Sequence, residues 1–506
     1  MCLRVFYHIF VSSDAYLNFV TDDFYYYFLP AKHFVEQGIS SFDGVTITNG
    51  YHPLWMLFLS ALNVISFGNE QLFFGLLAIV CAFSTYFTFR CFWIIAHKVF
   101  PTNRLIPVII LPVVVVFGGL IFLGMEITLT IPLYAYLLWT ILQLDFNREL
   151  TIRTSLTLGI LSSLLILSRL DTGILIGLFL IFILISYKLS AKQLLAFGTY
   201  FVIGGILLPL YFLLNYYWFG HLMTVSSSAK TLSDGNVFDF SSLKHLALNR
   251  DGIGGLLLIP FGIAALFLKG NRQQPISHRI VCFLVLLFPV FFYGTVLVNS
   301  SWFLNRWYFY PLPFCTFITI ALLTNGLFSK ISERKSRLIR RITMVIISAL
   351  TIIFSVVLLY RDTVRWQLEP NSLYIHAKGM LSFTKSHPGI YGMGDRAGLT
   401  AYILKIPIIQ LEGLNADFKM RDHIQRQDEL LSVLKSYHID YLIETTDKEG
   451  LPKEQNCYKI EEPHSGQAGQ LSKKMRGLIC SEPIFSLTTG NPNEYQVKTY
   501  IFDLKK

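Results

Sequence analysis

Charged residues are scarce in this chain of 506 amino acids. Only 15% of its positions are Asp, Glu, Lys or Arg, whereas a typical soluble domain has about 25%. Hydrophobic residues make up 53%, and the mean hydropathy is +0.52. This composition excludes a disordered chain and a fibrous repeat. The sequence therefore predicts a polytopic α-helical membrane protein.

Cysteine is also scarce. The chain has seven cysteines, too few for a disulfide framework. Five of them lie in or beside apolar segments, where buried free thiols are common. Cys457 and Cys480 fall in a more polar region, and they could pair if that region lies outside the cytoplasm. We also expect no cleavable signal peptide.

The charge that is present is concentrated in the last third of the chain. In residues 361–506, 37 of 146 positions are charged, against 37 of 360 in residues 1–360. This contrast predicts a membrane domain over 1–360, with a first outer loop at 21–70, followed by a soluble α/β domain over 361–506. The net charge of +10 lies almost wholly in the membrane part. It indicates loop asymmetry and contact with lipid headgroups rather than a nucleic-acid surface.

Ten apolar runs are candidates to cross the roughly 30 Å of hydrocarbon in a bilayer. They lie at 71–97, 105–123, 127–144, 154–168, 173–187, 193–217, 252–268, 279–298, 307–328 and 341–360. A poorer segment at 3–20, which contains Ser12, Ser13 and Asp14, is expected to be an irregular first span or the remainder of a span that begins upstream of the given start. The apolar segment after His52 is short and ambiguous.

The distribution of basic residues decides how that ambiguous segment is placed. If it does not cross, sixteen Lys and Arg residues fall in loops on one side and six fall in longer loops on the other. If it did cross, this asymmetry would be lost, contrary to the positive-inside rule. We therefore expect a helix that lies along the outer surface, about eleven spans, and a C-terminal domain outside the cytoplasm.

This topology places an unusual set of ionisable residues on the outer face. Such groups are costly at membrane depth, so they are candidates for function. The set comprises Asp22, Asp23, Lys32, His52, Glu126, Arg169, Asp171, Lys230 and Arg306.

Each member of this set also has a purely structural alternative. Asp22 could cap a helix that starts at Asp23, and His52 could be a polar cap before Pro53. Glu126 could be a surface acid at a helix start. Arg169 and Asp171 could simply pair, and Lys230 and Arg306 could snorkel at the interface. The tyrosines at 25–27 are interpreted as an interfacial aromatic belt rather than as a platform for the substrate.

Taken together, these residues favour a catalytic site over the separate structural explanations. Two acids end the first span, a third follows two spans later on the same face, and bases gather there too. This arrangement suits a reaction between a lipid-anchored phosphate and a hydroxyl. The acids would activate the hydroxyl, and the bases would hold the phosphate as it leaves.

The motifs that carry these residues resemble a known class of enzymes. The first loop contains DDFYYYF, GISSFDG and TNGYHPLW, and the segments FLGMEIT, LSRLDTG, SSSAK, NRWYFYPLP and PIIQLEGLNAD follow in order. Together they are similar to GT-C class integral membrane glycosyltransferases, most closely to bacterial envelope mannosyl- and arabinosyltransferases and more distantly to protein O-mannosyltransferases. The relatives differ in having a clean apolar first span.

The resemblance implies the roles of several residues. A first-loop aspartate acts as the base, and this role falls on Asp22 first and Asp23 second. Glu126 matches a second-loop acid that assists catalysis or binds a metal in some relatives. Lys230 and Arg306 are best placed to hold the donor phosphate, while Lys32, His52, Arg169 and Asp171 are further substrate-binding candidates. No cofactor is assigned, and a divalent metal is left open because metal dependence varies across the class.

The resulting hypothesis is a glycosyltransferase of the bacterial inner membrane. It would move a monosaccharide from a polyprenyl-phosphate donor to a glycan, lipid or protein acceptor on the extracytoplasmic face, with inversion. One alternative is a transporter or flippase of a lipid-linked glycan, although no internal repeat is evident. Another is a ligase that transfers a lipid-anchored polymer from a diphosphate donor.

The C-terminal region has the pattern of a small α/β domain. GIYGMGD, PIIQLEG and YLIET are predicted to contain strands, and a helix is predicted near 428–437. GMGDRAG lacks the spacing of a dinucleotide-binding fingerprint and is predicted to be a simple turn. We expect this domain to contact the acceptor or to cover the site.

Overall fold

The computed structural model describes most of the chain. The described residues are 20–101, 103, 105–146, 150–187, 189–232, 255–299, 304–330, 372–446, 450–464, 473–491 and 495–505, with isolated positions between 342 and 360. The expected spans at 3–20 and 341–360 fall almost wholly outside these residues.

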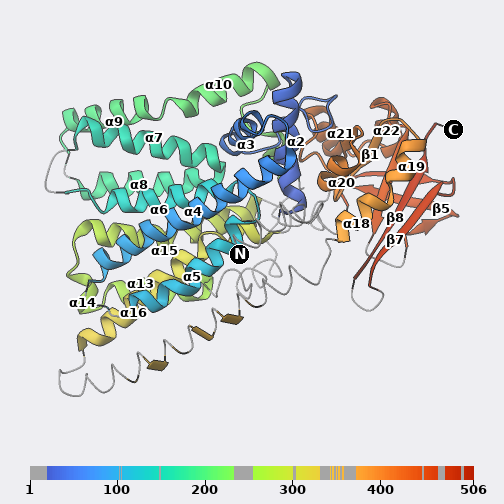
Figure 1. The fold of residues 1–506 in the computed structure, drawn as a ribbon. Helices are drawn as coiled ribbons and strands as arrows, with labels where there is room; N and C mark the ends of the chain where they lie inside the picture. Colours follow the sequence, from blue (N-terminus) through green and yellow to red (C-terminus); the bar gives the residue numbers. More distant parts are fainter. Residues whose placement is uncertain are drawn as a thin grey trace.

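The N-terminal part is a bundle of helices (Figure 1). The helices that follow the first loop are α2 (Asp22–Gln37), α3 (Pro53–Ile65), α4 (Glu70–Val99), α5 (Ile106–Ile121), α6 (Ile127–Ile141), α7 (Ile152–Ser168), η2 (Leu170–Thr172) and α8 (Gly173–Ser186). The rest are α9 (Ala191–Gly204), α10 (Leu207–Phe219), α11 (Val225–Ala229), α13 (Gly255–Leu266), α14 (Lys269–Arg272), α15 (Ile276–Asn299), η4 (Arg306–Phe309) and α16 (Leu312–Lys330).

Several of these helices are long and apolar enough to cross a membrane. Within the described residues, three segments meet both conditions: Glu70–Val99, Ile276–Val298 and Arg306–Gly326. Six further apolar helices have 10 to 17 residues. The apolar runs expected between residues 71 and 328 therefore form helices, while the total of about eleven spans stays a prediction.

The apolar run at 193–217 forms two helices rather than one. The helices α9 and α10 are bent by 52° at the break between them. Pro209 lies in the first turn of α10 and lacks the N–H that a continuous helix would donate to Gly205. In addition, a Cβ on Gly204 would lie 2.3 Å from the carbonyl oxygen of Leu156, so α9 packs tightly on α7 at this point.

The ambiguous apolar segment forms the short helix α3. Its 13 residues give a length of about 20 Å, which is less than the roughly 30 Å of the hydrocarbon core. Pro53 occupies its first turn, where a missing N–H costs nothing. A straight crossing by α3 alone would therefore leave the bilayer unspanned.

The C-terminal part alternates helices and strands. Its elements are α18 (Ser372–Gly379), α19 (Leu381–Ser386), β1 (Tyr391–Met393), α20 (Ala397–Leu404), β2 (Ile408–Gln410), α21 (Phe418–Arg426), α22 (Leu430–Ser436), β3 (Tyr441–Thr446), β4 (Lys453–Glu454), β5 (Cys457–Glu462), β6 (Met475–Ile479), β7 (Phe485–Asn491) and β8 (Tyr495–Asp503). The strands predicted in GIYGMGD, PIIQLEG and YLIET are β1, β2 and β3, and the helix predicted near 428–437 is α22.

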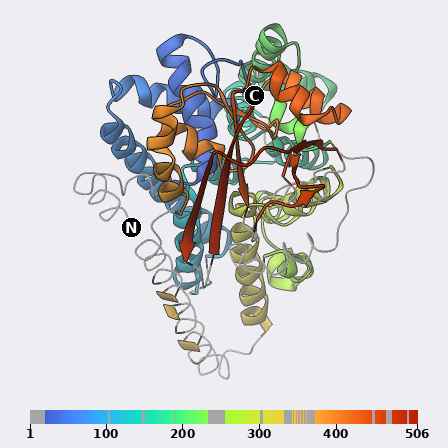
Figure 2. The same cartoon turned by 90° about the vertical axis from the view of Figure 1, so that its right-hand side faces the viewer.

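These strands form two sheets. The larger has the order β2-β1-β3-β8-β7, in which β1 is parallel to β2 and β3, while β8 is antiparallel to β3 and β7. Every residue of β3 is buried, as expected for a central strand covered on both faces. The smaller sheet has the order β4-β5-β6 and is antiparallel. Seen end-on, the strands lie in front of the helix bundle (Figure 2).

The two parts meet at α2, which lies between the bundle and the C-terminal elements (Figure 1). Aromatic rings form much of this contact: Tyr402 of α20 packs against Tyr25 and Phe28, with ring centroids 4.9 and 5.5 Å apart. Tyr25, Tyr26 and Tyr27 are all at least 92% buried. The interpretation of these tyrosines as an interfacial belt is therefore wrong, because they belong to the core that joins the two parts.

Candidate active site

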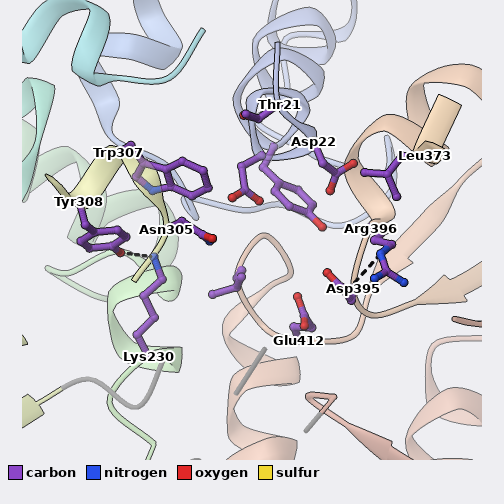
Figure 3. A pocket seen from close by; sticks show the side chains of 13 residues that line it. Thr21, Asp22, Lys230, Asn305, Trp307, Tyr308, Leu373, Asp395, Arg396 and Glu412 are labelled. Atoms are coloured by element: carbon purple, nitrogen blue, oxygen red, sulfur yellow. Dashed lines mark hydrogen bonds and ion pairs between the residues drawn. The ribbon is translucent and has the colours of Figure 1, made fainter. Parts of the chain in front are cut away.

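A cavity of about 240 Å³ opens where the start of α2, the segment around η4 and the C-terminal part meet. Its lining combines acids, bases and aromatic rings: Thr21, Asp22, Asp23, Tyr26, Lys230, Asn305, Trp307, Tyr308, Leu373, Asp395, Arg396, Glu412 and Leu414. Figure 3 shows Lys230, Tyr308 and Trp307 on one side and Leu373, Asp395 and Arg396 on the other. Residues more than 370 positions apart in the sequence thus form one site.

Asp22 joins the first loop to the C-terminal part. Its Oδ1 accepts a hydrogen bond of 2.6 Å from the backbone N–H of Leu399, in the first turn of α20. A Cβ on Gly398 would lie 2.5 Å from the backbone oxygen of Asp22, so this close approach requires glycine. Helix α2 itself begins at Asp22 with Thr21 as its N-cap. The structural alternative that Asp22 caps its own helix is wrong, because it caps α20 instead.

Asp23 has different surroundings. Among the described residues, none hydrogen-bonds to its carboxylate. Burial raises the pKa of Asp23 to about 8, the nearby charge of Asp22 adds to the rise, and Lys230 opposes it. Burial raises the pKa of Asp22 to about 7, partly offset by the hydrogen bond from Leu399. Both acids therefore titrate near or just above neutral pH, and within the described part of the chain Asp23 is the one without a hydrogen-bonded partner.

Glu126, Arg169 and Asp171 form an ion network beside the cavity, in which Glu126 and Arg169 are buried and Asp171 is partly exposed. Arg169 is 1% exposed, donates through Nη1 to Glu126 Oε1, and donates through Nε to Asp171 Oδ2 at 2.9 Å. Tyr27 donates to the other oxygen of Glu126 at 3.0 Å. Glu126 is therefore not a surface acid, and Arg169 does more than pair with Asp171. None of these three lines the cavity, and each is already engaged by charged partners.

Tyr308 lies between the ion network and the cavity and contacts both. The guanidinium of Arg169 lies 4.5 Å from the centre of the Tyr308 ring, and Tyr308 accepts a hydrogen bond of 3.1 Å from Lys230 Nζ. Burial lowers the pKa of Lys230, but its contact with Tyr308 outweighs this and raises the pKa overall. Lys230 therefore stays charged at the cavity wall.

His52 lies behind the network rather than in the cavity. Its ring stacks on Tyr27, with centroids 6.4 Å apart, and its Nδ1 accepts a hydrogen bond of 3.4 Å from the backbone N–H of Leu170. Although His52 is the N-cap residue of α3, its side chain makes no capping hydrogen bond. The alternative that it acts as a helix cap is therefore wrong.

The remaining two candidates do not line the cavity. Arg306 begins η4, between the lining residues Asn305 and Trp307. Lys32 lies ten residues beyond Asp22 along α2 and forms a 4.0 Å ion pair with Glu36 on the same helix. Of the nine candidates, Asp22, Asp23 and Lys230 line the cavity, and Glu126, Arg169, Asp171 and His52 form the layer next to it.

Sequence reasoning missed the residues that the C-terminal part contributes. Asp395 and Arg396 pair at 3.5 Å in the turn of GMGDRAG, and Glu412 follows β2 in PIIQLEG. Glu412 is 3% exposed; Gln410 donates to its Oε2 at 3.0 Å, while its Oε1 has no hydrogen-bond partner among the described residues. The prediction of a turn in GMGDRAG is confirmed. The one available signal was an adjacent acid and base directly after a buried strand.

The fit of a divalent metal can be judged from the same residues. Within the described part of the chain, no group of three or more His, Cys, Asp or Glu side chains is arranged to hold a metal ion. Glu412 offers one buried oxygen that has no partner within the described ranges, but Asp22 is bound to α20 and Asp395 to Arg396. The described residues therefore do not form a metal site, and no chemical step is assigned to one.

Comparison with solved structures bears on the fold. ArnT from Cupriavidus metallidurans in the apo state matches with a TM-score of 0.50 and 13% sequence identity, over 94% of this chain and 93% of ArnT. The chain has the fold of ArnT. This confirms the predicted resemblance to the GT-C class at the level of the fold.

ArnT from the same organism bound to undecaprenyl phosphate matches with a TM-score of 0.49 and 13% identity, over 98% of this chain and 96% of ArnT. No protein-family model matches the chain, and no curated protein matches it significantly.

Proposed function

We propose that this chain is an integral membrane glycosyltransferase that moves a monosaccharide from a polyprenyl-phosphate donor to an acceptor hydroxyl. The observation that carries the proposal is that carboxylic acids and a cation line the same cavity. Two partly buried acids with raised pKa values, Asp22 and Asp23, share it with the charged amine of Lys230. Acids tuned toward neutral pH suit proton transfer, and a fixed cation suits a departing phosphate.

The reaction follows from this arrangement in one displacement. A carboxylate takes the proton of the acceptor hydroxyl, and the oxygen forms a bond to the anomeric carbon. The bond from that carbon to the donor phosphate breaks, and its electron pair leaves with the lipid phosphate. A single in-line displacement inverts the anomeric centre.

The contacts favour Asp23 as the base, although the resemblance put Asp22 first. The carboxylate of Asp22 already accepts a hydrogen bond from Leu399, which favours its ionised form and ties it to α20. Asp23 has no hydrogen-bonded partner among the described residues, so its carboxylate oxygens are available to accept from an acceptor hydroxyl. Asp22 then orients α20, which borders the acceptor side.

Donor and acceptor are assigned to opposite walls of the cavity. Lys230 and Tyr308 form the wall that would hold the donor phosphate, with Arg306 nearby as a second cation. Leu373, Asp395, Arg396 and Glu412 form the other wall, where the acceptor glycan, lipid or protein would lie (Figure 3). Carboxyl groups such as Glu412 can both accept from and donate to hydroxyls when neutral, and burial raises the pKa of Glu412 well above its usual range.

The proposed site lies on the extracytoplasmic face of the bacterial inner membrane. The asymmetry of basic residues supports this orientation, with about eleven spans in residues 1–360 and an α/β domain over 361–506. A disulfide between Cys457 and Cys480 supports it as well, because disulfides persist outside the reducing cytoplasm.

A transfer assay tests the proposal directly. The purified chain in lipid nanodiscs would be incubated with synthetic polyprenyl-phosphate hexoses and pentoses and with an envelope extract as acceptor. We expect sugar-dependent release of free polyprenyl phosphate, measured by mass spectrometry. Movement of a lipid-linked glycan across proteoliposomes without any donor consumption would contradict the proposal and favour the flippase alternative.

A further inference from the structure

The segment Thr48-Asn49-Gly50, which we call the clasp, holds both walls of the cavity without lining it. On the acceptor side, Thr48 Oγ1 donates to the carbonyl oxygen of Ala416 at 2.7 Å. A Cβ on Gly50 would lie 2.0 Å from the carbonyl oxygen of Leu414, so only glycine fits against this turn. The clasp is thus hydrogen-bonded to, and packed against, the turn that follows Glu412.

Asn49 forms hydrogen bonds with the opposite wall. It is 1% exposed, and both ends of its amide are used. Its Oδ1 accepts a 2.8 Å hydrogen bond from the backbone N–H of Val225, the first residue of α11. Its Nδ2 donates to Asn215 Oδ1 at 2.9 Å, and Asn215 in turn donates to the carbonyl oxygen of Leu222 at 2.8 Å.

The position of α11 sets the position of Lys230. The helix has five residues, so its length is about 7 Å, and Lys230 is its C-cap residue. Thr224 caps the helix through the N–H of Ser227 at 3.3 Å, but that bond lies within the segment and does not anchor it to the first loop. The hydrogen bond between Asn49 and Val225 does anchor α11 to the first loop. A short helix moves as a unit, so a shift at Val225 carries Lys230 with it.

We propose that Asn49 is a positioning residue for the donor phosphate, acting through α11 and Lys230. This inference rests on the proposed function, because it takes Lys230 as the phosphate-binding cation. A misplacement of about 1 Å can cost up to a hundredfold in an active site. Because the buried side chains of Val225 and Ala229 also hold α11, we expect an intermediate loss.

Two variants remove the same hydrogen bond from opposite sides. Asn49→Ala removes the acceptor, and Val225→Pro removes the donor. Proline suits the first position of a helix, and Thr224 is extended at φ −70° and ψ 149°, a conformation that a following proline favours. Asn103→Ala is the matched control, since Asn103 is also buried and bonded, to Thr324 at 2.8 Å, beyond the far end of the roughly 45 Å helix α4.

The test measures binding of undecaprenyl phosphate in nanodiscs by native mass spectrometry. We expect Asn49→Ala and Val225→Pro each to bind about tenfold more weakly than the wild type, while Asn103→Ala binds normally. Because Asn49 acts through Lys230, the double variant Asn49→Ala/Lys230→Ala should bind no more weakly than Lys230→Ala alone. Normal binding by both folded clasp variants, or additive losses in the double variant, would overturn the proposal.

A second readout does not depend on the lipid. The rate at which an amine-reactive reagent modifies Lys230 would be followed by peptide mass spectrometry in the unliganded protein. We expect faster modification in both clasp variants than in the wild type and the Asn103→Ala control; an unchanged rate would overturn the role of Asn49. If the wild type binds no undecaprenyl phosphate but the clasp variants still expose Lys230, the proposed donor is wrong and the positioning of Lys230 by Asn49 stands.

Discussion

Two adjacent aspartates have different surroundings because of the helix that carries them. Asp22 and Asp23 are the first two residues of α2, so their side chains project about 100° apart. Both line the cavity with Lys230, but only Asp22 also accepts a hydrogen bond from the start of α20. The start of a helix favours negative charge, whereas burial opposes it, and at Asp23 burial dominates.

The raised pKa of Asp23 predicts opposite pH trends for activity and stability. Turnover should rise with pH and level off above about pH 8, because the base must be ionised. The folded protein binds this proton more tightly than the unfolded chain, whose aspartate has a pKa of 3.8. The resulting stabilisation is complete below pH 3.8 and is lost as the pH rises through about 8.

The variant Asp23→Asn isolates this contribution. Asparagine does not titrate, so the melting temperature of the variant relative to the wild type should be higher at pH 9 than at pH 6. Differential scanning fluorimetry in detergent at both pH values would measure it. An equal difference at the two pH values would mean that Asp23 does not titrate in this range.

Lys230 and Arg306 should differ in their effect on the donor. Lys230 lines the cavity and bonds to Tyr308, whereas Arg306 lies outside the lining. We expect both Lys230→Ala and Arg306→Ala to weaken donor binding more than acceptor binding, and the effect of Lys230→Ala to be larger. Donor and acceptor KM values of each variant would decide it. Unchanged donor KM and kcat in Arg306→Ala would remove Arg306 from the site.

At the scale of elements, the smaller sheet is joined by a disulfide. Strands β5 and β6 are antiparallel, with Tyr458 opposite Ile479, so Cys457 and Cys480 face each other one position further out. Their Cα atoms are 4.0 Å apart, and the structure pairs them, which the sequence had left open. The bridge closes a segment with a sequence separation of 23.

Loss of this bridge should destabilise the C-terminal part. A loop of this length corresponds to about 3 kcal/mol of unfolding free energy. We expect Cys457→Ser to lower the melting temperature, and reducing agent to lower that of the wild type but not of the variant. Intact mass after alkylation checks the pairing itself. Two thiols that react without reduction would show that the bridge is absent.

The elements were easier to predict than their contacts. Local patterns identified the strands in GIYGMGD, PIIQLEG and YLIET, because alternation and buried apolar runs are properties of a few neighbouring residues. The bend between α9 and α10 was missed because the apolar run continues through it. The sequence contains Pro209 and the adjacent glycines Gly204 and Gly205, but a hydropathy profile takes no account of residues that break helices.

At the scale of the whole molecule, the C-terminal part completes the cavity of the membrane part. Asp22 and Leu399 are 377 positions apart, and Tyr26 accepts a hydrogen bond from Asn415 across 389 positions. A single sequence contains no signal for such contacts. The first-loop acids were therefore predictable from their position after an expected span, whereas Asp395 and Glu412 were found only once the chain was folded.

The contact between the two parts makes the membrane topology testable. The first loop and the C-terminal part are in contact, so they must face the same side of the membrane. We expect Val45→Cys and Lys419→Cys to react with a membrane-impermeant maleimide in intact cells. Arg272→Cys should react only after permeabilisation. The free cysteines within the described residues are buried and give little background. Labelling of Arg272→Cys from outside would overturn the orientation.

The most direct test of the proposed mechanism compares Asp23→Asn with Asp22→Asn. Asparagine at position 23 cannot accept the hydroxyl proton, and a general base contributes about 10²–10⁴-fold. Asparagine at position 22 keeps an oxygen for the Leu399 N–H, so α20 should stay in place. Turnover of donor and acceptor would be measured for both variants at saturating donor, with undecaprenyl phosphate binding as the control. The account predicts at least about a hundredfold loss for Asp23→Asn and less than about tenfold for Asp22→Asn, with normal binding in both. Near-normal turnover by Asp23→Asn would contradict it.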